Sequence, residues 1–168
     1  MISDKKTKLQ SRLITVIIPL YNHERFIRQA IDSVFQQTYP NIELIVIDDG
    51  STDRSADVAE AAIHQQQTRM ARLIRQKNRG PHEAMNAGLA AAKGDFLTFL
   101  NSDDFYHPER LSTCLAEMEK SNADCSLSYV HYVDENSQPL DFIHPYRQWY
   151  GAQVMGELIA VSVSASLL

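Results

Sequence analysis

The sequence lacks the features that mark several large classes of protein. Its 168 residues include only two cysteines, Cys114 and Cys125, without Cys-x-x-Cys or Cys/His ligand spacing. They predict neither a disulfide framework nor a zinc site. No two of the six histidines stand four residues apart, so we expect all six to be surface residues. The formal net charge of -5 and the absence of a basic run argue against binding to nucleic acid.

Long apolar segments and targeting signals are also missing. The apolar stretch 158–168 is interrupted by serines and is far shorter than the roughly 20 residues that a membrane span needs. Residues 1–12 are polar and rich in lysine, without the apolar core of a signal peptide, and predict a loose leader. We therefore expect a cytoplasmic protein with one domain over 13–168. Peripheral association with the inner face of a membrane and homo-oligomerisation both stay open.

Glycine-rich nucleotide loops are absent as well. The chain has six glycines and contains neither Gly-x-Gly-x-x-Gly nor Gly-x-x-x-x-Gly-Lys-Ser/Thr. These absences exclude a dinucleotide cradle and a phosphate-binding loop of the usual kinds. The composition, 44% hydrophobic and 22% charged, is nevertheless ordinary for a soluble domain with a sizeable core.

What the chain does contain is an alternation of strand and helix patterns over about 120 residues. Apolar, β-branched runs predict strands at 13–19, 42–47, 71–75, 96–100 and 125–133. Pro19 ends the first of these, Asn22 is the expected cap of the helix that follows, and Thr52 or Asp53 caps the next helix. The fold class is therefore α/β, a mostly parallel sheet flanked by helices on both faces, with strand 96–100 covered on both sides. Ligands of such sheets bind at the carboxyl ends of the strands.

The helices between these strands are predicted from apolar residues at helical spacing. Met85, Leu89 and Ala92 mark the buried face of the third helix, and Lys93 and Gly94 follow at its end. A further helix after Pro108 carries Leu111, Cys114, Leu115 and Met118 at helical spacing, which predicts core positions.

Polar side chains follow three of the predicted strands. Tyr21 and Asn22 follow the first strand, Asp48 and Asp49 end the second, and the fourth leads into 101–104, which is Asn-Ser-Asp-Asp. Adjacent carboxylates repel each other unless a cation or a hydrogen-bond network offsets the cost. Helix capping explains one such pair, but two pairs at the same edge of one sheet indicate a ligand site.

Several motifs in unbroken order over 13–115 resemble the amino-terminal half of a family 2 glycosyltransferase. The matching segments are 15–22 (TVIIPLYN), 33–40 (SVFQQTYP), 43–52 (ELIVIDDGST), 84–89 (AMNAGL), 94–95 (GD) and 100–104 (LNSDD). The resemblance implies a GT-A fold and an inverting transfer of a sugar from a nucleotide diphosphate sugar, usually UDP-linked, to an acceptor hydroxyl. It also implies a place in polysaccharide or glycolipid assembly, with a sugar or a lipid-linked molecule as the acceptor.

The resemblance further implies roles for single residues. Pro19 and Tyr21 would line the base pocket, Asp48 would accept a hydrogen bond from uracil, and Asp103 would hold a divalent metal. Asn101 stands where the family usually has the first acid of an Asp-x-Asp motif, which makes metal dependence the less secure part of the resemblance. The full set of candidate nucleotide-sugar-binding residues is Pro19, Tyr21, Asn22, Asp48, Asp49, Arg79, Asn86, Ser102 and Asp104.

The implied chemistry suits these residue types. A carboxylate such as Asp48 only accepts hydrogen bonds, which favours the imide N–H of uracil over cytosine. Mn²⁺ or Mg²⁺ at Asp103 would stabilise the charge that develops on a pyrophosphate leaving group. Arg79 reaches toward the diphosphate in this interpretation, and a merely solvated loop arginine is the alternative. Asn86 has a plain helix-face role as its alternative.

The general base that an inverting transfer needs is not identified. Among the carboxylates after Asp104, Asp134 near a predicted strand end is the candidate that we retain. We therefore expect a donor-binding half whose acceptor side is truncated or unusual. The alternative is a catalytically incomplete nucleotide-sugar-binding module, or an interaction partner of another chain. A nucleotidyltransferase is disfavoured because the first strand does not lead into a glycine-rich basic loop.

Overall fold

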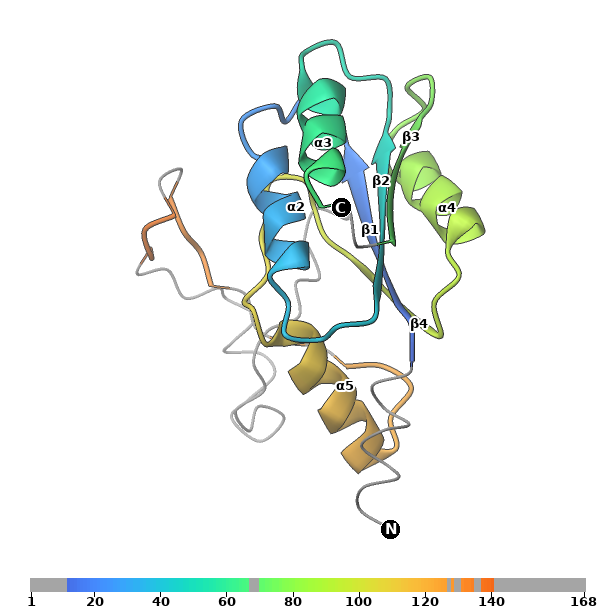
Figure 1. Cartoon of the computed structure of the whole chain (residues 1–168), viewed down its shortest axis with the longest axis vertical. Helices are drawn as coiled ribbons and strands as arrows, with labels where there is room; N and C mark the ends of the chain where they lie inside the picture. The colour runs from blue at the N-terminus through green and yellow to red at the C-terminus, as the bar shows by residue number, and fades with distance from the viewer. Residues whose placement is uncertain (1–11, 67–69, 127, 129–130, 135–136, 141–168) are drawn as a thin grey trace. The chain divides into compact units, whose positions relative to one another are not determined.

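The computed structural model describes residues 12–66, 70–126, 128, 131–134 and 137–140. Parallel strands form a four-stranded sheet in the order β3-β2-β1-β4 (Figure 1). The strands are β1 (Ile14–Leu20), β2 (Ile42–Asp48), β3 (Met70–Arg75) and β4 (Phe96–Phe99). The helices that follow them in turn are α2 (Ile27–Phe35), α3 (Ser55–His64), α4 (Pro81–Ala91) and α5 (Arg110–Ser121). The predicted alternation of strands and helices is confirmed.

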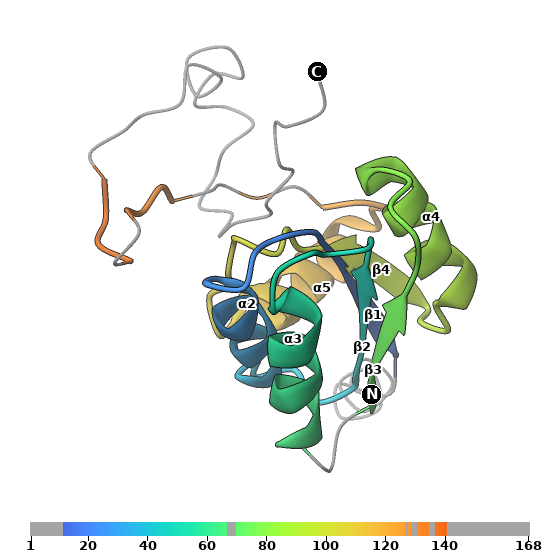
Figure 2. The same cartoon turned by 90° about the horizontal axis from the view of Figure 1, so that it is seen from above.

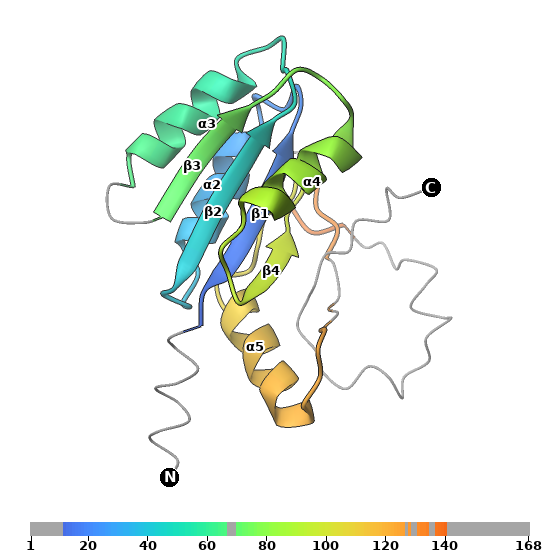
Figure 3. The same cartoon turned by 90° about the vertical axis from the view of Figure 1, so that its right-hand side faces the viewer.

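Helices cover both faces of the sheet. α2 and α3 lie on one face and α4 lies on the other (Figures 2 and 3). Side chains of β1 and β2 at odd positions, including Ile17 and Ile45, pack with Ala84 of α4. Their neighbours at even positions, such as Val16 and Val46, are also fully buried. Burial at both parities is what a central parallel strand under two helical layers requires.

Two expected burial patterns are wrong. β4 is the edge strand of the described sheet, and its Leu97 is 48% exposed, so this strand is not covered on both faces. Leu89 of α4 is 40% exposed, because smaller residues occupy the face toward the sheet. A Cβ added at Gly88 would lie 2.4 Å from the Ile17 Cγ2 atom. The helix therefore approaches the sheet too closely for a leucine at the contact.

Pro19 does not end β1, which continues to Leu20. The Ile17 carbonyl accepts the Leu100 N–H at 3.0 Å, so odd residues of β1 direct their backbone groups toward β4. The paired part of β4 stops opposite Ile17, at Phe99. A proline at position 19 therefore breaks no bond within the paired stretch 14–17 and lies just beyond the last bond of the β1–β4 ladder, which explains why a central strand tolerates it there.

The chain divides into two compact units, residues 1–111 and 112–168. In the described part, α5 has Leu111, Cys114 and Leu115 buried, as their spacing predicted. Of the predicted strand 125–133, residues 127, 129 and 130 lie outside the described residues, and the rest forms only one isolated antiparallel bridge, from Val133 to Pro139. Most of the predicted leader, and the stretch 158–168, also lie outside them. None of the helices described is long and apolar enough to cross a bilayer.

A buried acid organises the amino-terminal edge of the sheet. The Glu43 carboxylate, 3% exposed, accepts the Thr15 hydroxyl at 2.7 Å and the Lys93 N–H at 2.9 Å, and it pairs with Arg72 at 3.2 Å. The Gly94 N–H donates to the Thr15 hydroxyl at 2.9 Å. These bonds hold the turn between α4 and β4 against the sheet.

Gly94 fits this turn because it has no side chain. An added Cβ would lie 2.6 Å from the Thr15 backbone nitrogen and 2.5 Å from the Phe96 carbonyl oxygen. We predict that Gly94→Ala lowers the free energy of unfolding by about 1–3 kcal/mol, because backbone atoms of two strands must move. Urea denaturation checks this, with Lys93→Ala as the neighbouring exposed control. Equal stability of the two variants would contradict the prediction.

Candidate functional site

The loop after β1 is joined to the loop after β2 by hydrogen bonds. The Asn22 N–H donates to the Ser51 hydroxyl at 3.1 Å, and the Asn22 side-chain carbonyl accepts the Thr52 N–H at 2.8 Å. Asn22 has a φ of +53° and does not cap α2, which begins five residues later at Ile27. The expected capping role is therefore wrong: the asparagine tolerates the left-handed conformation and uses its side chain between the loops.

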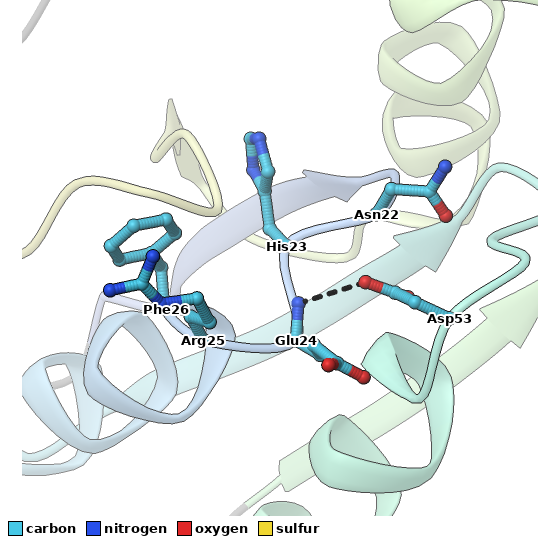
Figure 4. Close-up of a pocket in the computed structure, with 6 residues that line it drawn as sticks. All are labelled: Asn22, His23, Glu24, Arg25, Phe26 and Asp53. Atoms are coloured by element: carbon cyan, nitrogen blue, oxygen red, sulfur yellow. Dashed lines mark hydrogen bonds between the residues drawn. The ribbon is translucent and has the colours of Figure 1, made fainter.

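Asp53 continues this junction and lines a pocket. Its carboxylate accepts the Glu24 N–H at 3.2 Å and the Ser55 N–H at 2.9 Å. The N-cap position of α3 is Arg54, which makes no side-chain cap, so the predicted cap at Thr52 or Asp53 is wrong. Burial raises the pKa of Asp53, but hydrogen bonds from Ser55 and Glu24 outweigh it, and the pKa falls below its ordinary value of 3.8. The pocket, of about 240 Å³, is lined by Asn22, His23, Glu24, Arg25, Phe26 and Asp53 (Figure 4).

Asp48 ends β2 with one carboxylate oxygen committed and one available. The residue is 4% exposed, and its Oδ1 atom accepts the Ser51 N–H at 3.2 Å. Its Oδ2 atom accepts no hydrogen bond from the described part of the chain. A nearly buried carboxylate oxygen without a partner is a strong acceptor for a ligand N–H group.

Asp49 holds the loop between β3 and α4. Its carboxylate, 3% exposed, accepts the Gln76 side-chain N–H at 2.8 Å, the Arg79 N–H at 2.9 Å and the Gly80 N–H at 2.8 Å. Gly50, at φ +73°, lies so close to this loop that an added Cβ would be 2.8 Å from the Asn78 nitrogen. Since both oxygens of Asp49 are used within the protein, the geometry favours a positioning role for this residue.

The loop after β4 presents Asp103 to solvent. The Asn101 side-chain N–H donates to Asp104 Oδ2 at 3.0 Å, and the Asp104 N–H donates to the Asn101 carbonyl at 3.1 Å. Ser102 is 3% exposed, and its hydroxyl lies 2.7 Å from the Nδ1 atom of His23. Asp103 is exposed and accepts no hydrogen bond from any residue described. Its carboxylate is therefore available to a ligand.

The end of α2 fixes the chain after this loop. The buried Ser33 hydroxyl accepts the Tyr106 N–H at 3.0 Å. Gln37, also buried, accepts the Leu111 N–H at 3.0 Å and donates to the His107 carbonyl at 2.8 Å. These bonds give a physical reason for the polar residues in the 33–40 motif. They hold the segment that follows the acidic loop.

The predicted site residues fall into distinct groups. Pro19, Asp48, Asp49 and Ser102 are at strand ends and largely buried. Tyr21 is 46% exposed, and Arg79 and Asn86 are exposed on the β3–α4 loop and on α4. No group of three or more His, Cys, Asp or Glu side chains within the described ranges forms a metal cage.

Two residues stand apart from this pattern. Asp134 lies in the second unit, where its Oδ1 atom accepts the Gln138 N–H at 2.9 Å in a local turn. Its role as the base stays a prediction. His23, which we expected to be a surface residue, is instead half-buried and bound to Ser102. Its position directly after Asn22 was the one sequence signal that could have indicated this contact.

With this geometry established, the family is clear. The model of glycosyl transferase family 2 matches residues 15–157, and the chain belongs to that family. Glycosyltransferase GlyG of Streptococcus pneumoniae is 33% identical over 127 residues, which is 75% of this chain and 42% of that protein. The chain thus spans less than half the length of that relative.

Solved structures agree with this assignment. The S. aureus protein TarS in complex with UDP-GlcNAc superposes with a TM-score of 0.59 and 29% identity, over 65% of this chain and 32% of that one. Mannosyltransferase PcManGT from Pyrobaculum calidifontis, in complex with GDP-Man and Mn²⁺, gives a TM-score of 0.60 and 29% identity, over 71% and 35%. The expected GT-A fold is confirmed.

The role of Asp49 can be tested without a ligand. An asparagine at this position has one acceptor oxygen in place of two, so it cannot serve all three donors. We predict that Asp49→Asn lowers the free energy of unfolding by about 1–3 kcal/mol. Asp57→Asn is the matched control, because the Asp57 side chain is 74% exposed and pairs with Arg75 at the surface. Urea denaturation of both variants tests this prediction. An equal loss of unfolding free energy in the two variants would contradict the positioning role of Asp49.

Proposed function

We propose that this chain is the donor-binding part of an inverting glycosyltransferase that uses a UDP-linked sugar and a divalent metal. One observation carries the proposal. Asp48 offers a carboxylate oxygen to which no described residue donates, and Asp103 offers an exposed carboxylate, at the same edge of a family 2 sheet. UDP has an imide N–H in its base at one end and phosphate oxygens at the other, which suits these two groups.

The base end of the donor belongs at the tips of β1 and β2. The Asp48 Oδ2 atom accepts the uracil N3–H, and its partner Oδ1 is already held by Ser51. Tyr21, 46% exposed, offers an aromatic face against which a base can pack, and Pro19 of β1 would line the same base pocket. The neighbour TarS was solved with UDP-GlcNAc, which supports a uridine donor, whereas PcManGT was solved with GDP-Man.

The diphosphate end belongs at the loop after β4. The residues there fit a divalent cation of the Mg²⁺ or Mn²⁺ type, because such ions are commonly held by one or two carboxylates together with phosphate oxygens and water. Asp103 would hold the ion, with Asp104 beside it. When bound, the cation neutralises charge on the diphosphate as it leaves. The Mn²⁺ in the PcManGT complex supports this part of the proposal.

In the reaction, the acceptor hydroxyl oxygen forms a bond to the anomeric carbon of the sugar. The bond from that carbon to the diphosphate breaks, and the nucleoside diphosphate leaves with the electron pair. The hydroxyl proton passes to a general base, for which Asp134 is the candidate from the sequence. Arg79 and Asn86 are exposed, and in this proposal they contact the diphosphate and the ribose. We infer a sugar or lipid-linked acceptor, assembly of a polysaccharide or glycolipid, and a cytoplasmic location.

A nucleotide-sugar-binding module without turnover is the second candidate. It is kept because no general base for the transfer is identified in the sequence. Both candidates require the same donor site. They differ in turnover, so hydrolysis or transfer of a labelled UDP-sugar separates them once binding is established.

The donor site can be tested by calorimetric titration of UDP in the presence of Mn²⁺ or of EDTA. We predict binding that Mn²⁺ strengthens at least about tenfold, and Asp103→Asn removes this gain because an amide binds hard cations poorly. Asp57→Asn, at an exposed position on α3, is the control and retains the gain. Absence of UDP binding under every condition would contradict the proposal.

The base contact has its own test. We predict that Asp48→Asn weakens UDP binding by about tenfold to a hundredfold, because a charge-assisted hydrogen bond to a nearly buried carboxylate is lost. Titration with CDP is the internal comparison. Cytosine has no N3–H to donate, so its affinity changes little and the preference for UDP over CDP shrinks. An unchanged preference would show that Asp48 does not contact the base.

A further inference from the structure

His23 is the residue at which three loops meet. Its backbone N–H donates to the Ser55 hydroxyl at the start of α3, at 2.7 Å. Its ring Nδ1 atom lies 2.7 Å from the Ser102 hydroxyl in the loop after β4. The ring packs edge-on against Phe26, with 6.1 Å between the ring centroids. One residue thus joins the tip of β1 to the start of α3 through its backbone and to the loop that carries Asp103 through its side chain.

Ser102 transmits this contact to the acidic loop. The loop leaves the sheet at Leu100, whose N–H donates to the Ile17 carbonyl, and it is held again at Tyr106 by Ser33. Between these two points, the buried Ser102 hydroxyl binds the His23 ring. Asp103 follows Ser102 directly in the chain. The direction of the Asp103 carboxylate therefore depends on where His23 holds its neighbour.

We propose that His23 is a positioning residue for donor binding, and that its bond to Ser102 couples the base-binding tip of β1 to the metal-binding loop. The inference rests on the proposed function, since it assigns Asp103 to the metal. His23 itself touches neither the donor nor the metal. It acts by limiting the positions that the 101–104 loop can adopt, so a ligand that needs Asp103 in one place loses less freedom on binding.

The chemistry of the contact defines a matched pair of variants. An asparagine at position 23 places a polar atom near the position of Nδ1 and can bond to a hydroxyl as donor or acceptor. A leucine has similar bulk and cannot form this bond. His23→Asn is therefore the conservative variant and His23→Leu the disruptive one. Ser102→Ala removes the same bond from the other side.

The first measurement is UDP affinity with Mn²⁺ and with EDTA, by calorimetry, for these three variants and for the His23→Leu/Ser102→Ala double variant. We expect His23→Leu and Ser102→Ala each to weaken Mn²⁺-dependent binding about five- to tenfold. Binding in EDTA changes by less than about twofold, and His23→Asn stays within about threefold of the wild type. The double variant is no weaker than either single variant, because both remove one bond.

The second measurement needs no ligand. Amide hydrogen exchange of Asp104, whose N–H is bonded to the Asn101 carbonyl, reports on the loop, and exchange of Glu24 reports on the β1 side. We expect faster exchange at Asp104 in His23→Leu, unchanged exchange at Glu24, and near wild-type exchange at Asp104 in His23→Asn. Unchanged Asp104 exchange in His23→Leu overturns the inference.

The two measurements separate the two possible failures. If the wild-type chain binds no UDP in any condition, the proposed function fails. The comparison of Asp104 amide exchange between His23→Leu and the wild type then still tests whether His23 restrains the loop. If the wild type binds UDP with Mn²⁺ and His23→Leu binds equally well, the inference fails while the proposed function stands. Equal loss of binding in EDTA and in Mn²⁺ also overturns the inference, because it indicates general damage to the base site.

Discussion

Parallel pairing of β1 with both β2 and β4 is the constraint on which the rest of the structure depends. It brings the tips of three strands to one edge, although the paired residues of β1 and β4, such as Ile17 and Phe99, are 82 positions apart in sequence. Each tip carries polar groups that burial would penalise if they were left alone. The tips therefore satisfy one another: Asn22 bonds to Thr52, and His23 bonds to Ser55 and Ser102.

This mutual satisfaction divides the acidic residues into two kinds. The carboxylate oxygens of Asp49 and Asp53 accept hydrogen bonds from backbone N–H groups, and these bonds hold loops in place. Asp48 keeps one oxygen, and Asp103 keeps its whole carboxylate, for partners outside the described chain. The distinction is one of geometry, since all four are aspartates at the end of β2 or in the loops that follow β2 and β4. A site of this kind needs both, because an available carboxylate is useful only on a loop that does not move.

The sequence predicted the sheet well and the loops poorly. Runs such as 44–47 are apolar at every position, and burial under two helical layers is nearly the only way to satisfy them, so β1 and β2 were found within one residue. The exposure of Leu97 and Leu89 depends on which strand is at the edge and on how closely α4 approaches at Gly88. The periodicity of apolar residues in one segment indicates neither which strand lies at the edge nor how closely a helix approaches the sheet. The family motifs located Asp48 and Asp103, but the links through Asp49, Gln37 and His23 are tertiary contacts that no spacing rule encodes.

Pro19 has a consequence for where the sheet stops. In a parallel ladder, the residue at position 19 would donate its N–H to the Leu100 carbonyl, one step beyond the bond from the Leu100 N–H to the Ile17 carbonyl. Proline has no N–H to donate, so this next hydrogen bond between β1 and the segment after β4 cannot form. The segment after Leu100 is therefore no longer paired with β1. The imino acid in one strand thus determines the residue at which its neighbour becomes a loop, and the acidic segment 101–104 begins directly after that point.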